Sequence, residues 1–237
     1  MLVAAAVCPC PPLLVPDVAA GAAPELRAAR TACADAVGVL AASRPDRLFV
    51  VGPGGDAVDA PERYPAGSVG DFSGFGVDLR VRLGAGDAGD RPLPPSLAVG
   101  AWLLARARWA DAPAEGLAVA EGLAPARCAE AGRELAARAG RVALLVLGDG
   151  SACRTLKAPG YLDGRAAGFD AAAARALGAA DTGALAALDE RLARELKAAG
   201  RAPWQVLAGA AEDAGLAGRL LYEEAPYGVG YFVAAWS

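Results

Sequence analysis

The chain has 237 residues, a formal net charge of −4 and no histidine. Its length suits one large domain, because single hydrophobic cores stop growing near roughly 250–300 residues. The sequence contains no run of lysine or arginine, which argues against a nucleic-acid partner and against binding to anionic membranes. We therefore expect a single domain over residues 1–237 whose partners are small molecules or proteins.

Five cysteines are spread along the chain. An odd number at irregular spacing argues against a disulfide framework and favours reduced thiols in a reducing compartment. The longest apolar runs, such as Val142 to Leu147, are far shorter than the roughly 20 residues that span a bilayer, and no basic segment precedes the apolar N-terminal run. These features predict a cytoplasmic protein without a membrane segment.

The first part of the chain predicts two buried strands with a helix between them. Leu2 to Val7 is a continuous apolar run that ends at Cys-Pro-Cys-Pro-Pro, where proline stops the strand. From Pro24 to Ser43 apolar residues recur every three to four positions, which is typical of an amphipathic helix. Leu48 to Val51 is a second apolar run, and Gly-Pro-Gly-Gly follows it.

The rest of the chain predicts mainly helices. Residues 56–95 are dense in Gly, Pro and Asp and predict long loops with one edge strand around Val77 to Leu83. Helices are expected at Ser96–Trp109, Ala126–Ala139, Gly164–Leu177, Asp181–Ala198 and Ala202–Ala214, and strands at Val142–Leu147, Leu216–Tyr222 and Val229–Trp236. Non-alternating apolar strands between helices predict a three-layer α/β fold, in which helices flank a mostly parallel central sheet.

Three of the predicted strands end in unusual Gly-, Pro-, Cys- or Asp-containing segments, at residues 8–12, 52–55 and 148–151. In open α/β sheets, ligands bind beyond the carboxyl ends of the strands, where the strand order reverses. We therefore expect these three segments to converge and to form a pocket for a small molecule.

Cys8 and Cys10 are separated by a single proline, closer than the spacing of two to four residues in structural zinc sites. We therefore predict no zinc site. In one interpretation, both cysteines pack as small apolar groups where the proline ends the strand. In the other, Cys10 is an exposed thiol near Cys153 that is available for nucleophilic or redox chemistry.

Asp149 and Ser151 lie on a glycine-rich turn directly after a predicted strand, where they could bind a ligand or cap a helix. Without histidine there is no Ser-His-Asp triad, and Lys157, Asp149 or Glu224 would have to act as the general base. Glu223 and Glu224 stand at a strand end, where neighbouring side chains point in opposite directions. At most one of them faces a pocket, and the alternative is a pair of solvated charges.

Together these segments resemble the class III extradiol dioxygenases of the LigB type and, more distantly, the Memo-like proteins. Pro-Cys-Pro-Pro at residues 9–12 stands where the family has a motif similar to Pro-His-Pro-Pro, and Pro-Gly at 53–54 where its second strand ends in Pro-His. Gly-Asp-Gly-Ser-Ala at 148–152 is similar to its Gly-Asp-x-Ser-His segment. The similarity continues through Pro-Gly-Tyr at 159–161 and Phe-Asp at 169–170 to the run at 222–231.

The resemblance implies a sheet flanked by helices, with a pocket lined by Cys10, Pro53, Gly54, Asp149, Ser151, Ala152, Tyr161 and Glu224. The family holds non-haem iron with two histidines and a carboxylate. Here the matching positions are Cys10, Gly54 and Glu224, and Ala152 stands where the family has its acid/base histidine. Because glycine offers no ligand, the resemblance predicts that Fe(II) does not bind and that iron-dependent ring cleavage is absent.

Three functions remain open on the sequence alone. The first is a LigB-like protein that keeps a small-molecule pocket without dioxygenase activity. The second is a metal-independent enzyme that uses Cys10, with a thiol pKa below its ordinary value, or Asp149 and Glu224. The third is a scaffolding role, and an active dioxygenase is less favoured than any of these. The aromatic segment at residues 231–236 predicts either a homo-oligomer interface or core burial.

Overall fold

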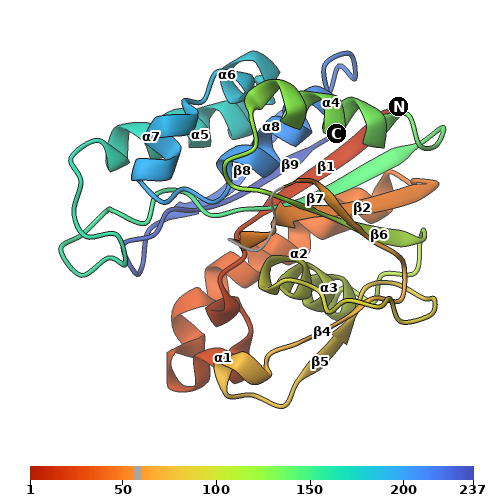
Figure 1. The fold of residues 1–237 in the computed structure, drawn as a ribbon, viewed down its shortest axis with the longest axis horizontal. Coiled ribbons are helices and arrows are strands. Elements are labelled where there is room, and N and C mark those ends of the chain that lie inside the picture. Colours follow the sequence, from red (N-terminus) through yellow and green to blue (C-terminus); the bar gives the residue numbers. More distant parts are fainter. Residues whose placement is uncertain (56–59) are drawn as a thin grey trace.

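A seven-stranded sheet runs through the centre of the computed structural model, which describes residues 1–55 and 60–237 (Figure 1). The strand order is β3-β6-β2-β7-β1-β9-β8. The strands are β1 (Leu2–Cys8), β2 (Arg47–Pro53), β3 (Glu62–Tyr64), β6 (Ala114–Val119), β7 (Val142–Leu147), β8 (Gly218–Glu224) and β9 (Tyr231–Trp236). The four central strands β6, β2, β7 and β1 are parallel to one another, whereas β3, β9 and β8 add antiparallel pairings at the two sides.

Helices cover both faces of this sheet (Figure 1). One face carries α2 (Arg27–Ala42) and α3 (Pro95–Arg106), and the short helices η1 (Pro12–Leu14), α1 (Pro16–Ala19) and η2 (Ala20–Leu26) precede α2. The other face carries α4 (Pro125–Ala136), α5 (Ala166–Ala179), α6 (Thr182–Ala186), α7 (Glu190–Glu195) and α8 (Arg201–Ala210). The predicted three-layer α/β architecture is therefore confirmed.

The two cores on either side of the sheet follow from the alternation of side chains along each strand. In β1, Ala4, Ala6 and Cys8 enter the core beneath α2 and α3, while Ala5 and Val7 enter the core beneath α4 to α8. The aromatic C-terminal side chains are also buried within the chain itself, so core burial accounts for them. Within the described residues, no helix combines the length and apolar character needed to cross a membrane.

The structure corrects the sequence-based prediction at two places. The helix expected at Asp181–Ala198 is two helices, because the Asp181 and Asp189 side chains each accept a backbone hydrogen bond and so each begin a helix. The strand expected around Val77–Leu83 forms only at β5 (Arg80–Arg82). It pairs with β4 (Val69–Asp71) in a separate two-stranded sheet, and η4 (Ser73–Phe75) joins the two strands.

Strand β6 lies in a stretch, residues 110–125, for which the sequence predicted no element, and it pairs with β2 inside the sheet. Of the loop expected over residues 56–95, residues 56–59 lie outside the described part of the chain.

Helices α4 and α8 cross at unusually close range because each presents a glycine to the other. A Cβ at Gly132 would lie 2.0 Å from the Val206 carbonyl oxygen, and a Cβ at Gly209 would lie 2.2 Å from the Ala129 carbonyl oxygen. Real Cβ atoms cannot occupy such positions, so the two backbones fit together only while both residues are glycine. The layer over the α4 face of the sheet depends on this contact.

We expect Gly132→Ala to lower the free energy of unfolding by about 1–3 kcal/mol, since the added methyl group forces the two helices apart. The matched control is Gly38→Ala on α2, where Gly38 is exposed and has no atom within 4 Å of an added Cβ. That change should raise stability by up to about 1 kcal/mol through helix propensity. Urea unfolding of both variants checks the prediction, and equal effects would contradict it.

Candidate functional site

The three segments expected to converge emerge side by side at the carboxyl edge of the sheet. The parallel register pairs Cys8 with Leu147 and Val51 with Val146, so the ends of β1, β7 and β2 are neighbours. After β1 the chain passes to α2 on one face, and after β7 it passes to α5 on the other. The connections therefore diverge between β1 and β7, which is the kind of switch point where α/β sheets bind ligands.

Asp149 lies at this switch point. Its Oδ1 accepts a hydrogen bond of 2.8 Å from the Cys10 N–H, and its carbonyl oxygen accepts one of 2.8 Å from the Gly200 N–H. Burial of the carboxyl raises its pKa from 3.8 to about 7; the bond from Cys10 opposes the shift and the charge of Glu121 adds to it. The residue keeps part of its surface in contact with solvent. A carboxyl with this pKa can accept or donate a proton near neutral pH.

Tyr231 is the first residue of β9 and follows Gly230, which exchanges backbone hydrogen bonds with the segment after β7. Because Val7 pairs with Ala234 in antiparallel register, the first residue of β9 lies beside the end of β1. Burial and the nearby charge of Asp149 raise the pKa of the Tyr231 hydroxyl. Sequence reasoning missed Tyr231 as a site residue, because the antiparallel return of the last strand beside the first leaves no local signal.

The expectation of an exposed, acidic Cys10 thiol near Cys153 is wrong. Cys10 is buried, and burial together with the charges of Asp149 and Glu121 raises its pKa well above 9.0. Cys153 belongs to the core on the opposite face of the sheet, where its Sγ donates to the Leu196 carbonyl oxygen at 3.4 Å. The alternative is confirmed, since Cys8 and Cys10 pack among apolar side chains.

A second carboxylate, that of Asp170 on α5, holds the segment after β7. It is fully buried and accepts hydrogen bonds from the Ser151 N–H at 2.7 Å, the Ser151 hydroxyl at 2.8 Å and Arg154 Nη1 at 2.9 Å. A Cβ at Gly150 or Gly230 would lie within 2.8 Å of an Asp170 oxygen. Ser151 is therefore fully buried and engaged in a structural hydrogen bond, rather than presented to a ligand.

Two other predicted residues form part of the edge itself. Pro53 is the last residue of β2, and its carbonyl oxygen accepts a hydrogen bond of 2.6 Å from the buried Ser96 hydroxyl. Gly54 follows it and donates its N–H to the Val119 carbonyl oxygen at 2.9 Å. Ala152 is buried, and its N–H donates to the Leu196 carbonyl oxygen at 2.9 Å.

The remaining predicted residues do not reach the switch point in this structure. Lys157 and Tyr161 are exposed on the loop between β7 and α5. Glu224 is exposed on β8 and accepts a hydrogen bond of 3.2 Å from the Tyr222 hydroxyl. Strands β1 and β9 lie between β7 and β8 in the sheet. A pairing of Glu224 with Asp149, which the sequence left open, is not seen among the described hydrogen bonds, in which the partner of Glu224 is Tyr222.

The residues at the family's iron positions do not fit a ferrous ion. Cys10 is a buried thiol with a raised pKa, Gly54 has no side chain, and Glu224 lies two strands away from β1 on the exposed side of β8. Across residues 1–55 and 60–237, no group of three His, Cys, Asp or Glu side chains is placed to hold a metal ion. Two of these positions lack the imidazoles that such iron sites use, and the third, Glu224, lies on β8 with β9 between it and β1.

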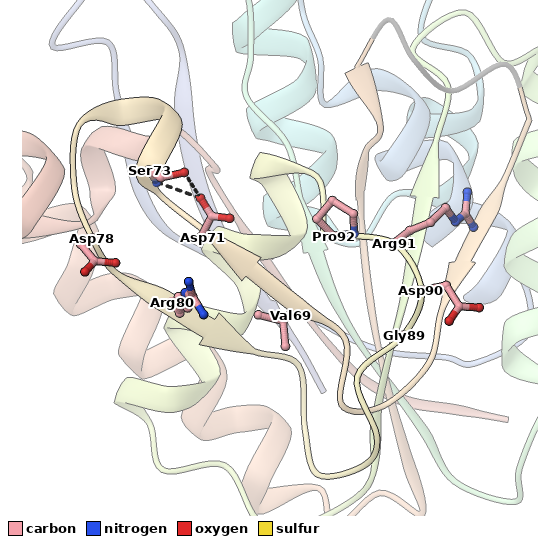
Figure 2. A pocket seen from close by; sticks show the side chains of 9 residues that line it. All are labelled: Val69, Asp71, Ser73, Asp78, Arg80, Gly89, Asp90, Arg91 and Pro92. Atoms are coloured by element: carbon pink, nitrogen blue, oxygen red, sulfur yellow. Dashed lines mark hydrogen bonds between the residues drawn. The ribbon is translucent and has the colours of Figure 1, made fainter.

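Five surface hollows lie elsewhere, and none of these five is lined by a residue predicted for the carboxyl edge. One of about 340 Å³ lies between the β4–β5 hairpin and residues 89–92 (Figure 2). In it, Asp71 accepts hydrogen bonds from the N–H and the hydroxyl of Ser73, and Arg91 pairs with Glu62 at 2.6 Å. Two of its charged groups are thus already engaged within the protein, which makes it a weaker candidate site.

No family model and no curated protein sequence matches the chain. A crystal structure of an uncharacterized protein from Escherichia coli K12 is similar to it, with a TM-score of 0.59 and 14% sequence identity. The alignment covers 99% of each chain. At this identity the likeness shows the fold alone. The chain is thus an α/β protein with a central sheet between two helical layers and a candidate site at the carboxyl edge.

The raised pKa of Asp149 predicts a pH-dependent stability. The unfolded chain releases this proton near pH 4 and the folded chain near pH 7, so the free energy of unfolding falls as the pH rises between these values. The variant Asp149→Asn keeps an oxygen that can accept the hydrogen bond from the Cys10 N–H. We expect its free energy of unfolding not to fall over this pH range, and to exceed that of wild type at pH 8 by about 2–4 kcal/mol. Urea unfolding at pH 5 and pH 8 measures the free energy of unfolding of both proteins. The control is Asp35→Asn, at an exposed aspartate on α2.

The buried Cys10 thiol predicts slow alkylation of the native protein, because the thiolate is the reactive form. We expect iodoacetamide to modify Cys10 no faster than the buried Cys33 and Cys128, as followed by mass spectrometry. Unfolding in urea should make all the thiols comparably reactive. Selective modification of Cys10 in the native protein would instead support the hypothesis that Cys10 is a nucleophile.

Proposed function

We propose that the chain is a LigB-like member of the extradiol dioxygenase superfamily that binds a small molecule at the carboxyl edge of its sheet, without iron-dependent ring cleavage. The observation that supports this most directly is the placement of Asp149. It lies between the diverging ends of β1 and β7, it is partly accessible, and its pKa is about 7. A strongly perturbed ionisable group at a switch point is a functional-site signal with a physical cause.

The charges at this edge favour one class of ligand. Asp149 has one amide donor and a negatively charged neighbour, Glu121. A ligand that donates hydrogen bonds from hydroxyl or amino groups would satisfy the remaining lone pairs of the carboxylate. An anionic ligand would be repelled once Asp149 ionises. We therefore expect neutral polyhydroxylated or amine-bearing molecules to bind in preference to acidic metabolites.

A second candidate function is metal-independent acid–base catalysis by Asp149. Its support is the pKa of about 7, which lies near the value that is most effective for a general acid or base at neutral pH. The version of this hypothesis that used Cys10 as a nucleophile has lost its support, because the thiol is buried and its pKa is raised. Scaffolding remains the alternative if the edge binds nothing.

The proposal places the protein in the cytoplasm. In support, all five cysteines are free and buried, as expected of thiols kept reduced in that compartment. A homo-oligomer has less support, because the aromatic C-terminal segment that suggested an interface is buried in the core.

Calorimetric titration with catechols, nucleotides and acidic metabolites tests the binding proposal. We expect a catechol-like diol to bind wild type and Asp35→Asn equally, and Asp149→Asn at least about tenfold more weakly, since a charge-assisted hydrogen bond is lost. If no compound binds, or if Asp149→Asn binds as well as the control, the proposal fails and a scaffolding role is favoured.

Metal analysis of the purified, untagged protein tests the other half of the proposal. After reconstitution with Fe(II), we expect neither stoichiometric iron nor oxygen uptake on catechol substrates, because the matching positions carry a buried thiol, a glycine and an exposed glutamate. A polyhistidine tag must be absent, since it binds metal itself. Stoichiometric iron with oxygen consumption would contradict the proposed absence of iron-dependent ring cleavage. The binding of a small molecule at Asp149 is tested separately by the titration above.

A further inference from the structure

A hollow of about 810 Å³ lies at the amino edge of the sheet, the edge opposite to that of Asp149. Its walls are the end of α3, the segment that follows β5, and residues 109–113, which lead into β6. Helix α3 packs against both β5 and β6, so the three walls belong to one packed unit (Figure 1). The volume lies within the range of roughly 300–1,000 Å³ that is typical of small-molecule sites.

Trp109 forms a fixed aromatic wall of this hollow. Where α3 ends, the Arg108 N–H donates to the Ala105 carbonyl oxygen at 3.1 Å, and the Trp109 N–H to that of Leu104 at 3.0 Å. The indole Nε1 donates to the Ala112 carbonyl oxygen at 2.8 Å, so both the backbone and the ring of Trp109 are anchored. The other three tryptophans are buried, whereas Trp109 is half-buried and lines the hollow. The hollow thus presents a pre-positioned indole ring.

Two guanidinium groups line the same hollow. The Arg108 side chain forms no ion pair or hydrogen bond with any residue that the structure describes. Arg82 is anchored through Nη1, which donates to the carbonyl oxygens of Gly67 at 3.3 Å and Gly86 at 3.0 Å, and its Nη2 has no acceptor within residues 1–55 and 60–237. Asp111 is the acidic residue of the lining, so two arginines and one aspartate give the hollow a net charge of +1.

The backbone at Arg108 has a conformation that favours glycine. Its φ is 53°, in the left-handed region, and it follows the end of α3, a place that glycine usually occupies. The arginine therefore makes the helix end less favourable than glycine would, and its side chain gains no described contact within the chain in return. Such local strain is characteristic of functional sites.

We propose that this hollow binds a planar aromatic molecule that carries one carboxylate, with its ring on Trp109 and its carboxylate on Arg108 and Arg82. A guanidinium offers planar donors that match the two oxygens of a carboxylate, and aromatic rings stack on an indole. The net charge of +1 matches a singly charged group. This site shares no residue with the edge at Asp149, and it does not depend on the binding proposed there.

The test is a calorimetric titration of the full chain with naphthoate and with its neutral counterpart, naphthylmethanol. We expect naphthoate to bind wild type at least about tenfold more tightly than the alcohol, because only the carboxylate forms charge-assisted hydrogen bonds. In Arg108→Gly the affinity for naphthoate should fall at least about tenfold, while that for the alcohol stays the same. Trp109→Ala should weaken the binding of both compounds about fivefold through the loss of stacking.

Glycine suits the backbone at residue 108, so Arg108→Gly removes the guanidinium without disturbing the helix end. The matched control is Arg44→Gly, at an exposed arginine with a φ of 46° just after α2 and outside the hollow. Nuclear magnetic resonance locates the ligand through the indole N–H signal of Trp109, which is identified by its loss in Trp109→Phe. This signal should shift on addition of naphthoate, whereas those of the buried Trp204 and Trp236 should not.

Three results would overturn the proposal. They are an absence of naphthoate binding up to millimolar concentrations, equal affinities of Arg108→Gly and Arg44→Gly for naphthoate, and an affinity for the alcohol that equals that for naphthoate. Asp149→Asn should bind naphthoate as wild type does. A loss of binding in that variant would place the ligand at the carboxyl edge of the sheet and would also contradict the proposal.

Discussion

The buried carboxylate of Asp170 fixes the shape of the carboxyl edge of the sheet. Three donors, one of them the guanidinium nitrogen of Arg154, compensate for taking its charge out of water. Gly150 and Gly230 approach this carboxylate and exchange backbone hydrogen bonds with the neighbouring chain: Gly150 N–H donates to the Gly230 carbonyl oxygen at 2.7 Å, and Gly230 N–H to that of Ser151 at 2.9 Å. The end of β7 and the start of β9 are thereby held at a constant spacing.

That spacing explains why two aspartates on neighbouring segments have different roles. Asp170 is saturated by donors and is inaccessible, so its role is structural. Asp149 receives one amide hydrogen bond, and its burial, with a further contribution from the charge of Glu121, raises its pKa to about 7. The chemical group is the same in both, and the two carboxyls differ in the number of hydrogen-bond donors that they receive.

Most of the fold was predictable because its strands and helices have strong local signals. The continuous apolar runs of β1, β2 and β7 are typical of strands buried on both faces, and the structure places them adjacent at the centre of the sheet. Strand β6 was missed because Glu115 and Gly116 interrupt its apolar character. Gly116 is there for a tertiary reason, since an added Cβ would lie only 3.0 Å from Leu97 and 3.1 Å from both Leu83 and Tyr64.

The sequence by itself determined the α/β class, the three strand ends that would meet, and the absence of imidazole ligands for iron. Only the tertiary structure decided that Cys10 is buried, that Tyr231 begins the strand beside the end of β1, and that Glu224 lies on β8, with β9 between it and β1. The physical reason is that burial and pKa depend on neighbours in space. The bond that links the Cys10 N–H to Asp149 joins residues 139 positions apart, and no local pattern encodes such a contact.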